Sequence, residues 1–104
     1  MDKKAFSFRI SQRANKDLLE IFAYIAFELA SPKAADDLID RIEERVDKLC
    51  DFPYSCSLMG DAFLRERGYR KATVKNFNLF YRVEDNMISI ERVLYNRRDM
   101  ERLF

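Results

Sequence analysis

Residues 69–95, YRKATVKNFNLFYRVEDNMISIERVLY, decide the fold because their hydrophobic pattern has a period of two. Apolar and polar side chains alternate along the segment, which is rich in aromatic and β-branched residues, as β-strands are. Asn76 and the pair Asp85–Asn86 interrupt the pattern with residues that favour tight turns. The segment therefore predicts an antiparallel meander of three strands, which cover 69–75, 77–84 and 87–95.

The residues before the meander predict a strand and then a helix. Residues 6–10 alternate between apolar and polar, which is typical of a strand. Ser11 is a favourable N-cap for a helix, and the apolar positions that follow it form two adjacent stripes at helical spacing. A helix that is apolar over so wide an arc is expected to be covered on two sides, so Tyr24 and Phe27 are assigned to the core.

A second helix is predicted to begin directly after the first. Pro32 cannot continue the first helix, but it suits the first turn of a new one with Ser31 as the cap. The new apolar stripe runs from Ala35 to Leu49, and Phe52–Pro53 ends it. Because the connection is so short, the two helices are expected to form an antiparallel hairpin.

The remaining segments complete the predicted topology. Residues 53–68 contain Pro, Ser and Gly and are interpreted as a loop, and residues 96–99 as the cap and first turn of a short terminal helix. The order is β-α-α-β-β-β. We therefore predict a single α+β domain over residues 1–104, with an antiparallel sheet and the N-terminal helical hairpin packed on one face.

The composition excludes several classes of protein. With 48% hydrophobic and 36% charged residues, the chain is too apolar to be disordered, and it contains no apolar run long enough to cross a membrane. It has no histidine, which removes Ser-His-Asp and Cys-His catalysis and most zinc sites. It also lacks a glycine-rich phosphate loop. We expect a cytoplasmic protein with no cofactor, no metal and no membrane association.

Positive charge is concentrated late in the sequence. Residues 65–82 hold six Lys or Arg against Glu66 alone, although the whole chain has 19 basic and 18 acidic residues. Strand alternation places Lys71 and Lys75 on one face of the predicted strand and Arg70 on the other. One face or rim of the sheet is therefore expected to gather Lys71, Lys75, Arg82 or Arg92, with Arg97 and Arg98 arriving from beyond the last strand.

These cations have two interpretations. Cations interleaved with aromatic side chains suit a phosphate backbone and unstacked bases. RNA can be cleaved without metal or histidine when its 2′-OH attacks the adjacent phosphate, Arg stabilises the transition state and a desolvated Lys acts as the base. Lys71 is the candidate for that base. The alternative is a solvated strand face whose cations pair with Glu84, Glu91 and Asp99.

Two other features of the sequence have structural interpretations. Acidic residues recur along the second helix from Asp36 to Asp51, and some lie four apart, a spacing that suits a divalent ion. Basic residues are interleaved with them, which instead indicates a solvated helix face, and these are Arg41, Arg45 and Lys48. Cys50 and Cys56 lack the spacing of a metal site or a C-x-x-C motif and are interpreted as small buried hydrophobic residues.

Three segments occur together in one known family. Residues 14–25 fit A-x-x-D-L-x-x-I-x-x-Y-I, and residues 49–53 fit L-x-x-F-P. Residues 80–83 and 88–99 provide a Y-x-V hairpin and the ending R-V-L-Y-x-R-R-D, with Tyr95 in the usual histidine place. By the order and spacing of these segments, residues 6–100 resemble the RelE/ParE superfamily of toxins from bacterial type II toxin–antitoxin (plasmid stabilisation) modules.

The resemblance implies a growth-inhibiting protein and two alternative targets. ParE-like members poison DNA gyrase, whereas RelE-like members cut mRNA on the ribosome. The segment at residues 14–25 and the R-R-D ending look more ParE-like, so gyrase inhibition is the first expectation. A RelE-like protein would be a metal-independent endoribonuclease with Lys71, Arg97 and Tyr95 as catalytic residues. The remaining cations are then expected to bind RNA or another target, and these are Arg70, Lys75, Arg82, Arg92 and Arg98.

Two departures from the RelE pattern weaken the ribonuclease expectation. Asn78 stands where RelE-like members carry an arginine, and Leu103 or Phe104 occupies the place of their C-terminal tyrosine. The resemblance implies a cognate antitoxin as partner, which we expect to insert a helix or strand into an apolar groove beside the sheet. A further alternative is an inactive interaction module, whose basic face only binds a partner segment.

Overall fold

A four-stranded sheet organises the computed structural model, which describes residues 6–95. Its order is β1-β4-β3-β2, where β1 is Ser7–Ile10, β2 Arg70–Val74, β3 Phe77–Glu84 and β4 Met87–Tyr95. Strands β2, β3 and β4 form the predicted antiparallel meander. Strand β1 instead runs parallel to β4, so the sheet is mixed. No tight turn joins β1 to β4, because the helices and two strands separate them, and nothing local therefore fixes their relative direction.

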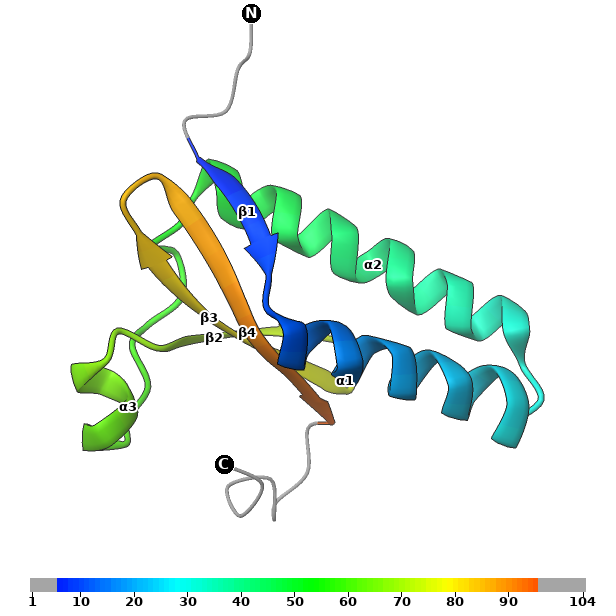
Figure 1. Ribbon diagram of the computed structural model, residues 1–104. Coiled ribbons are helices and arrows are strands. Elements are labelled where there is room, and N and C mark those ends of the chain that lie inside the picture. Colours follow the sequence, from blue (N-terminus) through cyan, green and yellow to red (C-terminus); the bar gives the residue numbers. More distant parts are fainter. Residues whose placement is uncertain (1–5, 96–104) are drawn as a thin grey trace, which may run out of the picture.

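The helical hairpin begins as predicted (Figure 1). Helix α1 spans Gln12–Ala23, and the Ser11 side chain caps it by accepting the Ala14 N–H at 3.0 Å. Helix α2 spans Pro32–Asp51, with the proline in its first turn. The predicted continuous first helix ends early, however, in a π-helical turn at Tyr24–Glu28. Ala30 then adopts a left-handed φ of 51°, a conformation that normally favours glycine.

The assignment of Tyr24 and Phe27 to the core is wrong. Tyr24 is 56% exposed and Phe27 77% exposed, and Leu19 and Leu29 are exposed as well. Figure 1 shows the reason, since α1 and α2 run side by side beyond the end of the sheet. The far end of the hairpin therefore lacks a sheet beneath its second apolar stripe, and it packs chiefly within itself.

The core lies between the near half of the hairpin and one face of the sheet. Helix α2 contributes the stripe Leu38, Ile42, Val46 and Leu49, and the sheet contributes residues such as Leu79, Tyr81, Ile88 and Ile90. The contact between a helical hairpin and one sheet face confirms the predicted α+β class.

The segment interpreted as a loop contains one further element. Helix α3, Ala62–Glu66, begins at Asp61, whose side chain accepts the Leu64 N–H at 3.0 Å. The terminal helix predicted at residues 96–99 lies outside the described residues. None of the described helices combines the length and apolar character that a membrane span requires.

Candidate functional site

The register of the sheet divides the candidate residues between two faces. Residues Ala72, Val74 and Leu79 belong to the core, so their neighbours along each strand point to the opposite side. We call that side the outer face; it carries Lys71, Thr73, Asn78, Phe80, Arg82 and Ser89. Tyr69 and Met59 pack against Phe80 and Leu94, which form a second, smaller apolar cluster.

Lys71 and Arg82 share the outer face, as the sequence predicts. Lys71 lies opposite Phe80 in the β2–β3 register and is exposed. Arg82 lies on β3, two residues after Phe80, and its guanidinium is 5.7 Å from the centre of the Tyr69 ring. Lys75 follows the last residue of β2 with a left-handed φ of 53°, so it turns at the rim of the sheet rather than standing on the face.

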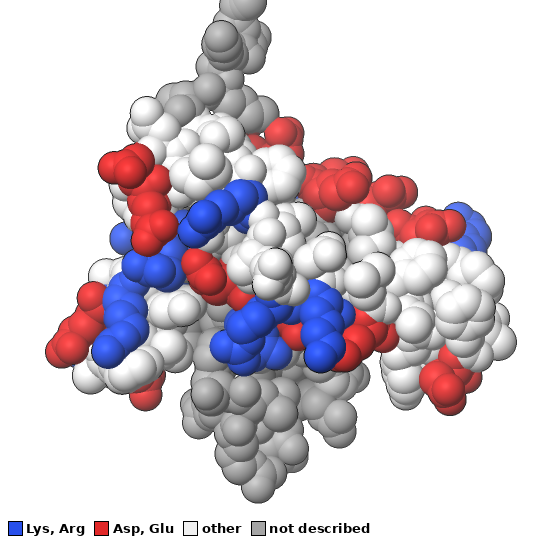
Figure 2. All heavy atoms as spheres, in the orientation of Figure 1, with Lys and Arg blue, Asp and Glu red and all other residues white. Residues whose placement is uncertain are grey.

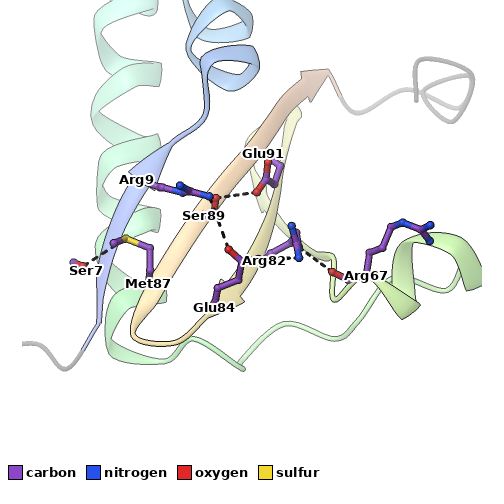
Figure 3. A network of polar contacts seen from close by, with 8 residues as sticks. All are labelled: Ser7, Arg9, Arg67, Arg82, Glu84, Met87, Ser89 and Glu91. Atoms are coloured by element: carbon purple, nitrogen blue, oxygen red, sulfur yellow. Dashed lines mark hydrogen bonds and ion pairs between the residues drawn. The ribbon is translucent and has the colours of Figure 1, made fainter.

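A network of polar contacts links three strands across the outer face (Figure 3). Arg82 donates to the Arg67 carbonyl at 2.8 Å and forms an ion pair with Glu84 at 2.8 Å. Arg9 of β1 donates to the buried Ser89 hydroxyl at 3.0 Å, and Ser89 in turn donates to Glu91 at 2.8 Å. The arginines are therefore held in place by neighbouring acceptors, which keeps this face polar and orders the side chains before any partner binds.

Arg70 lies on the other face, also as predicted. Its guanidinium donates to the Cys56 carbonyl and sits 5.1 Å from the centre of the Tyr54 ring. Both contacts fasten the segment after α2 to the start of β2. Cys50 is buried and Cys56 half-buried, and neither forms a disulfide.

Arg92 is committed to a partner that the sequence analysis did not identify. A register shift at Phe80/Tyr81 places Arg92 opposite Phe80, and its guanidinium then reaches Asp17 of α1 through two hydrogen bonds of 2.8 and 3.0 Å. The two side chains are only 15% and 11% exposed. The hydrogen bond to Asp17 raises the pKa of Arg92 above its ordinary value. This pair joins a helix to the sheet, so Arg92 has a structural partner on α1.

Asp17 also completes the edge of β4. Strand β1 pairs with β4 only as far as Ile90, and beyond that point Asp17 accepts the Val93 N–H at 3.0 Å. A buried N–H without a partner is costly, so one carboxylate satisfies both the strand edge and the arginine. Asp17 is the aspartate of the A-x-x-D-L segment. The sequence pattern did not predict its partners Arg92 and Val93, because they lie on a distant strand.

Tyr95 and Lys71 do not come together. Tyr95 lies opposite Phe77, with the two ring centres 5.3 Å apart, and Phe77 packs against the core between sheet and helices. Tyr95 is therefore on the helix-packed face, whereas Lys71 is on the outer face. Arg97 and Arg98 lie outside the described residues.

Tyr81 and Asn78 of β3 are also built into the fold. Tyr81 is fully buried, and its hydroxyl donates to the Pro53 carbonyl at 3.2 Å. Burial raises the pKa of Tyr81 well above its ordinary value. Asn78 is 2% exposed, and its side-chain oxygen accepts the Thr73 hydroxyl at 3.1 Å.

Charge on the visible surface is mixed rather than uniformly basic. Figure 2 shows Lys and Arg in separate groups over the sheet with acidic side chains between them, and acidic side chains along the upper edge. The acidic residues of α2 from Asp36 to Asp51 are all exposed, in agreement with a solvated helix face. Within residues 6–95, no group of three or more His, Cys, Asp or Glu could hold a metal ion.

A groove beside the sheet has a charged lining. It lies between α2 and the outer edge of β2, with a volume of about 220 Å³. Its lining consists of Arg41, Glu44, Arg45, Lys48, Thr73, Val74 and Lys75. The sequence analysis assigned Arg41, Arg45 and Lys48 to a solvated face of α2, where they offset its acidic residues. In the structure these three side chains line the groove beside β2.

With this geometry in hand, comparison with known proteins identifies the family. The sequence profile described as "ParE toxin of type II toxin-antitoxin system, parDE" matches residues 8–100. The chain belongs to the ParE toxin family. The match spans all three segments on which the RelE/ParE resemblance was based, and it confirms the ParE side of that superfamily.

A solved structure supports the fold of this ParE-family toxin. A chain described as "Chromosomal ParDE TA system from P. aeruginosa" superposes with a TM-score of 0.73 at 22% sequence identity. The alignment covers 91% of the present chain and 100% of the other. No curated protein sequence matches the chain. At this identity the structural similarity speaks for the α+β fold alone.

Proposed function

We propose that this ParE-family toxin arrests bacterial growth by inhibiting DNA gyrase and that a cognate antitoxin neutralises it. The observation that carries the choice of gyrase is the separation of Lys71 and Tyr95 onto opposite faces of the sheet. A general base and its helper must both reach the same phosphodiester, within hydrogen-bond distance of the reacting atoms. Within the described residues, Lys71 and Tyr95 do not converge on one phosphodiester, as the ribonuclease alternative requires.

The outer face is the proposed docking surface for the target. Lys71 is exposed there, Arg82 is ordered beside it by Glu84, and Lys75 lies at the adjoining rim. Positive side chains on such a surface increase the rate of encounter with an acidic partner more than they increase affinity. Arg70 and Arg92 are excluded from this role because they hold the fold together.

Neutralisation is supported by the unpartnered end of the helical hairpin. Leu19, Tyr24, Phe27 and Leu29 are each more than half exposed. Exposed apolar side chains in this number on a small protein are typical of a surface that binds another protein. We propose that the antitoxin covers this end of the hairpin.

Pulse labelling after tight induction in bacteria tests the target. We expect thymidine incorporation to fall before methionine incorporation within the first minutes, followed by an SOS response. The purified protein should also inhibit supercoiling by gyrase in vitro. If methionine incorporation falls first and supercoiling is unaffected, RelE-like mRNA cleavage replaces the proposal. If neither changes despite soluble expression, the chain is an inactive interaction module.

Charge reversal tests the docking surface. Lys71→Glu should weaken inhibition of supercoiling several-fold without loss of the folded state, whereas Lys33→Glu serves as the control. Lys33 is 87% exposed in an ion pair on α2 and lies away from the sheet. Equal inhibition by both variants would remove Lys71 from the contact with gyrase.

The neutralising partner is tested with the product of the neighbouring reading frame. We expect its co-expression to restore growth in cells that produce the wild-type toxin. The variant Phe27→Asp should still arrest growth, because the side chain is outside the core, but it should no longer be rescued. Full rescue of the variant would place the antitoxin elsewhere.

A further inference from the structure

The groove between α2 and β2 brings cations from two separate elements to one small hollow. Arg41, Arg45 and Lys48 line it from α2, and Lys75 lines it from the end of β2. The three α2 positions are four and three residues apart, so they lie along one side of the helix over about 10 Å. Glu44 is the one carboxylate among the described residues that line the groove, whose net charge is therefore +3.

The neighbours of these cations do not neutralise them. Within residues 6–95, Arg41, Lys48 and Lys75 take part in no ion pair, although like charges brought so close repel one another. Arg45 donates to the Cys56 sulfur at 3.4 Å, and a thiol sulfur is a weak and uncharged acceptor. An anion placed between the four cations removes this repulsion, so the groove favours a bound anion.

Lys75 occupies a backbone position that lysine does not favour. Its φ is 53°, in the left-handed region where glycine or asparagine is the usual choice. Lys75 and Asn76 form the turn between β2 and β3, and asparagine at the first of these positions suits such a turn better. The lysine instead places a cation across the groove from those of α2, which gives the strained position a role in binding.

The net charge of the groove decides which anion fits it. A terminal phosphate carries about −1.5 to −2 at pH 7, and a phosphate linked on both sides carries about −1. Two linked phosphates therefore carry roughly −3, which balances the groove, whereas a single phosphate balances only about half to two thirds of it. The planar fork of arginine also matches the arrangement of phosphate oxygens.

We propose that the α2–β2 groove binds a diphosphate group, either as free pyrophosphate or as the end of a nucleoside diphosphate. Arg41 and Arg45 each present two N–H groups to the phosphate oxygens, while Lys48 and Lys75 act as point charges. Among the described residues that line the groove none is aromatic, so no ring stacks on a base. The groove therefore recognises the phosphates and does not discriminate between bases.

This inference goes beyond the proposed function, because it assigns a small ligand to a surface that shares only Lys75 with the proposed docking surface for gyrase. Its tests measure binding by the purified protein in the presence of EDTA, so that no divalent ion competes for the phosphates. Loss of toxicity therefore leaves the result unaffected, and failure to bind a diphosphate leaves the gyrase proposal standing.

Titration calorimetry with a series of ligands tests the chemistry of the site. Pyrophosphate and ADP should bind with a dissociation constant of about 100 µM or below at low salt, and more weakly as salt screens the charges. Orthophosphate and AMP carry one phosphate and should bind at least tenfold more weakly. Citrate is the control for charge alone, and it should bind several-fold more weakly than pyrophosphate because its charge is spread over three separate carboxylates.

Double variants separate the groove from general electrostatics. Arg41→Gln combined with Lys48→Gln should weaken ADP binding at least tenfold. Lys16→Gln combined with Lys33→Gln makes the same change in net charge at exposed helix positions outside the groove, and it should bind as the wild type does. The comparison isolates the contribution of the cations that line the groove.

Two single variants test the groove without removing a cation from α2. Glu44→Gln removes the carboxylate from the lining and should tighten ADP binding several-fold, whereas Glu43→Gln, at an exposed position outside the lining, should change it little. Lys75→Asn should raise the melting temperature, because asparagine tolerates the left-handed φ, and yet weaken ADP binding several-fold. Weaker binding by a more stable protein is not a consequence of misfolding.

The relative affinities assign the natural source of the diphosphate. Tighter binding of pyrophosphate than of ADP would indicate the free anion, tighter binding of ADP would indicate a nucleotide, and both results support the proposal. Equal affinities for ADP and AMP, or for pyrophosphate and citrate, would overturn it, as would equal losses in the two double variants. A single-stranded oligonucleotide without terminal phosphates that binds more tightly than ADP would assign the groove to a nucleic acid backbone instead.

Discussion

Removal of the Asp17 carboxylate is the sharpest test of how this fold is held together. Asp17→Ala leaves Arg92 charged and largely buried, and it also leaves the Val93 N–H without its acceptor. Breaking a buried ion pair from one side costs about 3–5 kcal/mol. A domain of this size has a total stability of roughly 5–15 kcal/mol, so the loss is a large fraction of it.

Urea denaturation followed by circular dichroism measures this loss. We expect a much lower midpoint with an unchanged slope, and a fall in melting temperature of roughly 12 °C or more. Asp37→Ala is the matched control, since its ion pair with Lys33 is 3.6 Å long and its side chains are 87% and 53% exposed. Such a surface pair contributes about 0.5 kcal/mol or less.

Two further variants separate the roles of the carboxylate. Asp17→Asn keeps an acceptor for the Val93 N–H and should fall between the wild type and Asp17→Ala. Asp17→Leu with Arg92→Met removes both charges and should recover much of the loss, because a buried pair can often be replaced by apolar residues. If Asp17→Ala costs no more than Asp37→Ala, the structural role that we assign to the pair is wrong.

Two other variants test local features of the fold. Because burial raises the pKa of Tyr81, the folded state keeps this proton when the unfolded chain loses it above about pH 10, and the unfolding free energy should fall as pH rises there. In Tyr81→Phe that decline should be shallower; parallel curves from pH 9 to pH 11 would contradict the assignment. Ala30→Gly relieves the left-handed φ of 51° and should raise the unfolding free energy by up to about 1 kcal/mol. The helical control Ala34→Gly should lower it by about 0.5–1 kcal/mol, so changes of the same sign would refute the strain argument.

Much of the candidate site followed from strand alternation. Lys71 and Arg82 were expected on one face and Arg70 on the other, and the register has that arrangement. Alternation could not show that Arg92 forms an ion pair with Asp17, because the two residues are 75 positions apart in the sequence. Nor could it place Arg41 and Lys48 at the edge of β2, since a helix pattern does not say which strand the helix will face.

The sequence by itself determined the four strands, the two long helices and their order. The cap at Ser11, the break at Pro32 and the turn at Asp85–Asn86 are local features, which depend on the preferences of a few adjacent residues. The segments that resemble the RelE/ParE superfamily are similarly local, and the ParE family match covers them.

Only the tertiary structure decided which surfaces are buried, paired or open. The parallel pairing of β1 with β4, the exposure of Tyr24 and Phe27, and the Asp17–Arg92 pair all depend on segments that are distant in the chain. Such contacts form where the folded chain brings surfaces together, and side-chain pattern along one element does not specify the partner. The far end of the hairpin is apolar in sequence, but it is exposed because the sheet ends before it does.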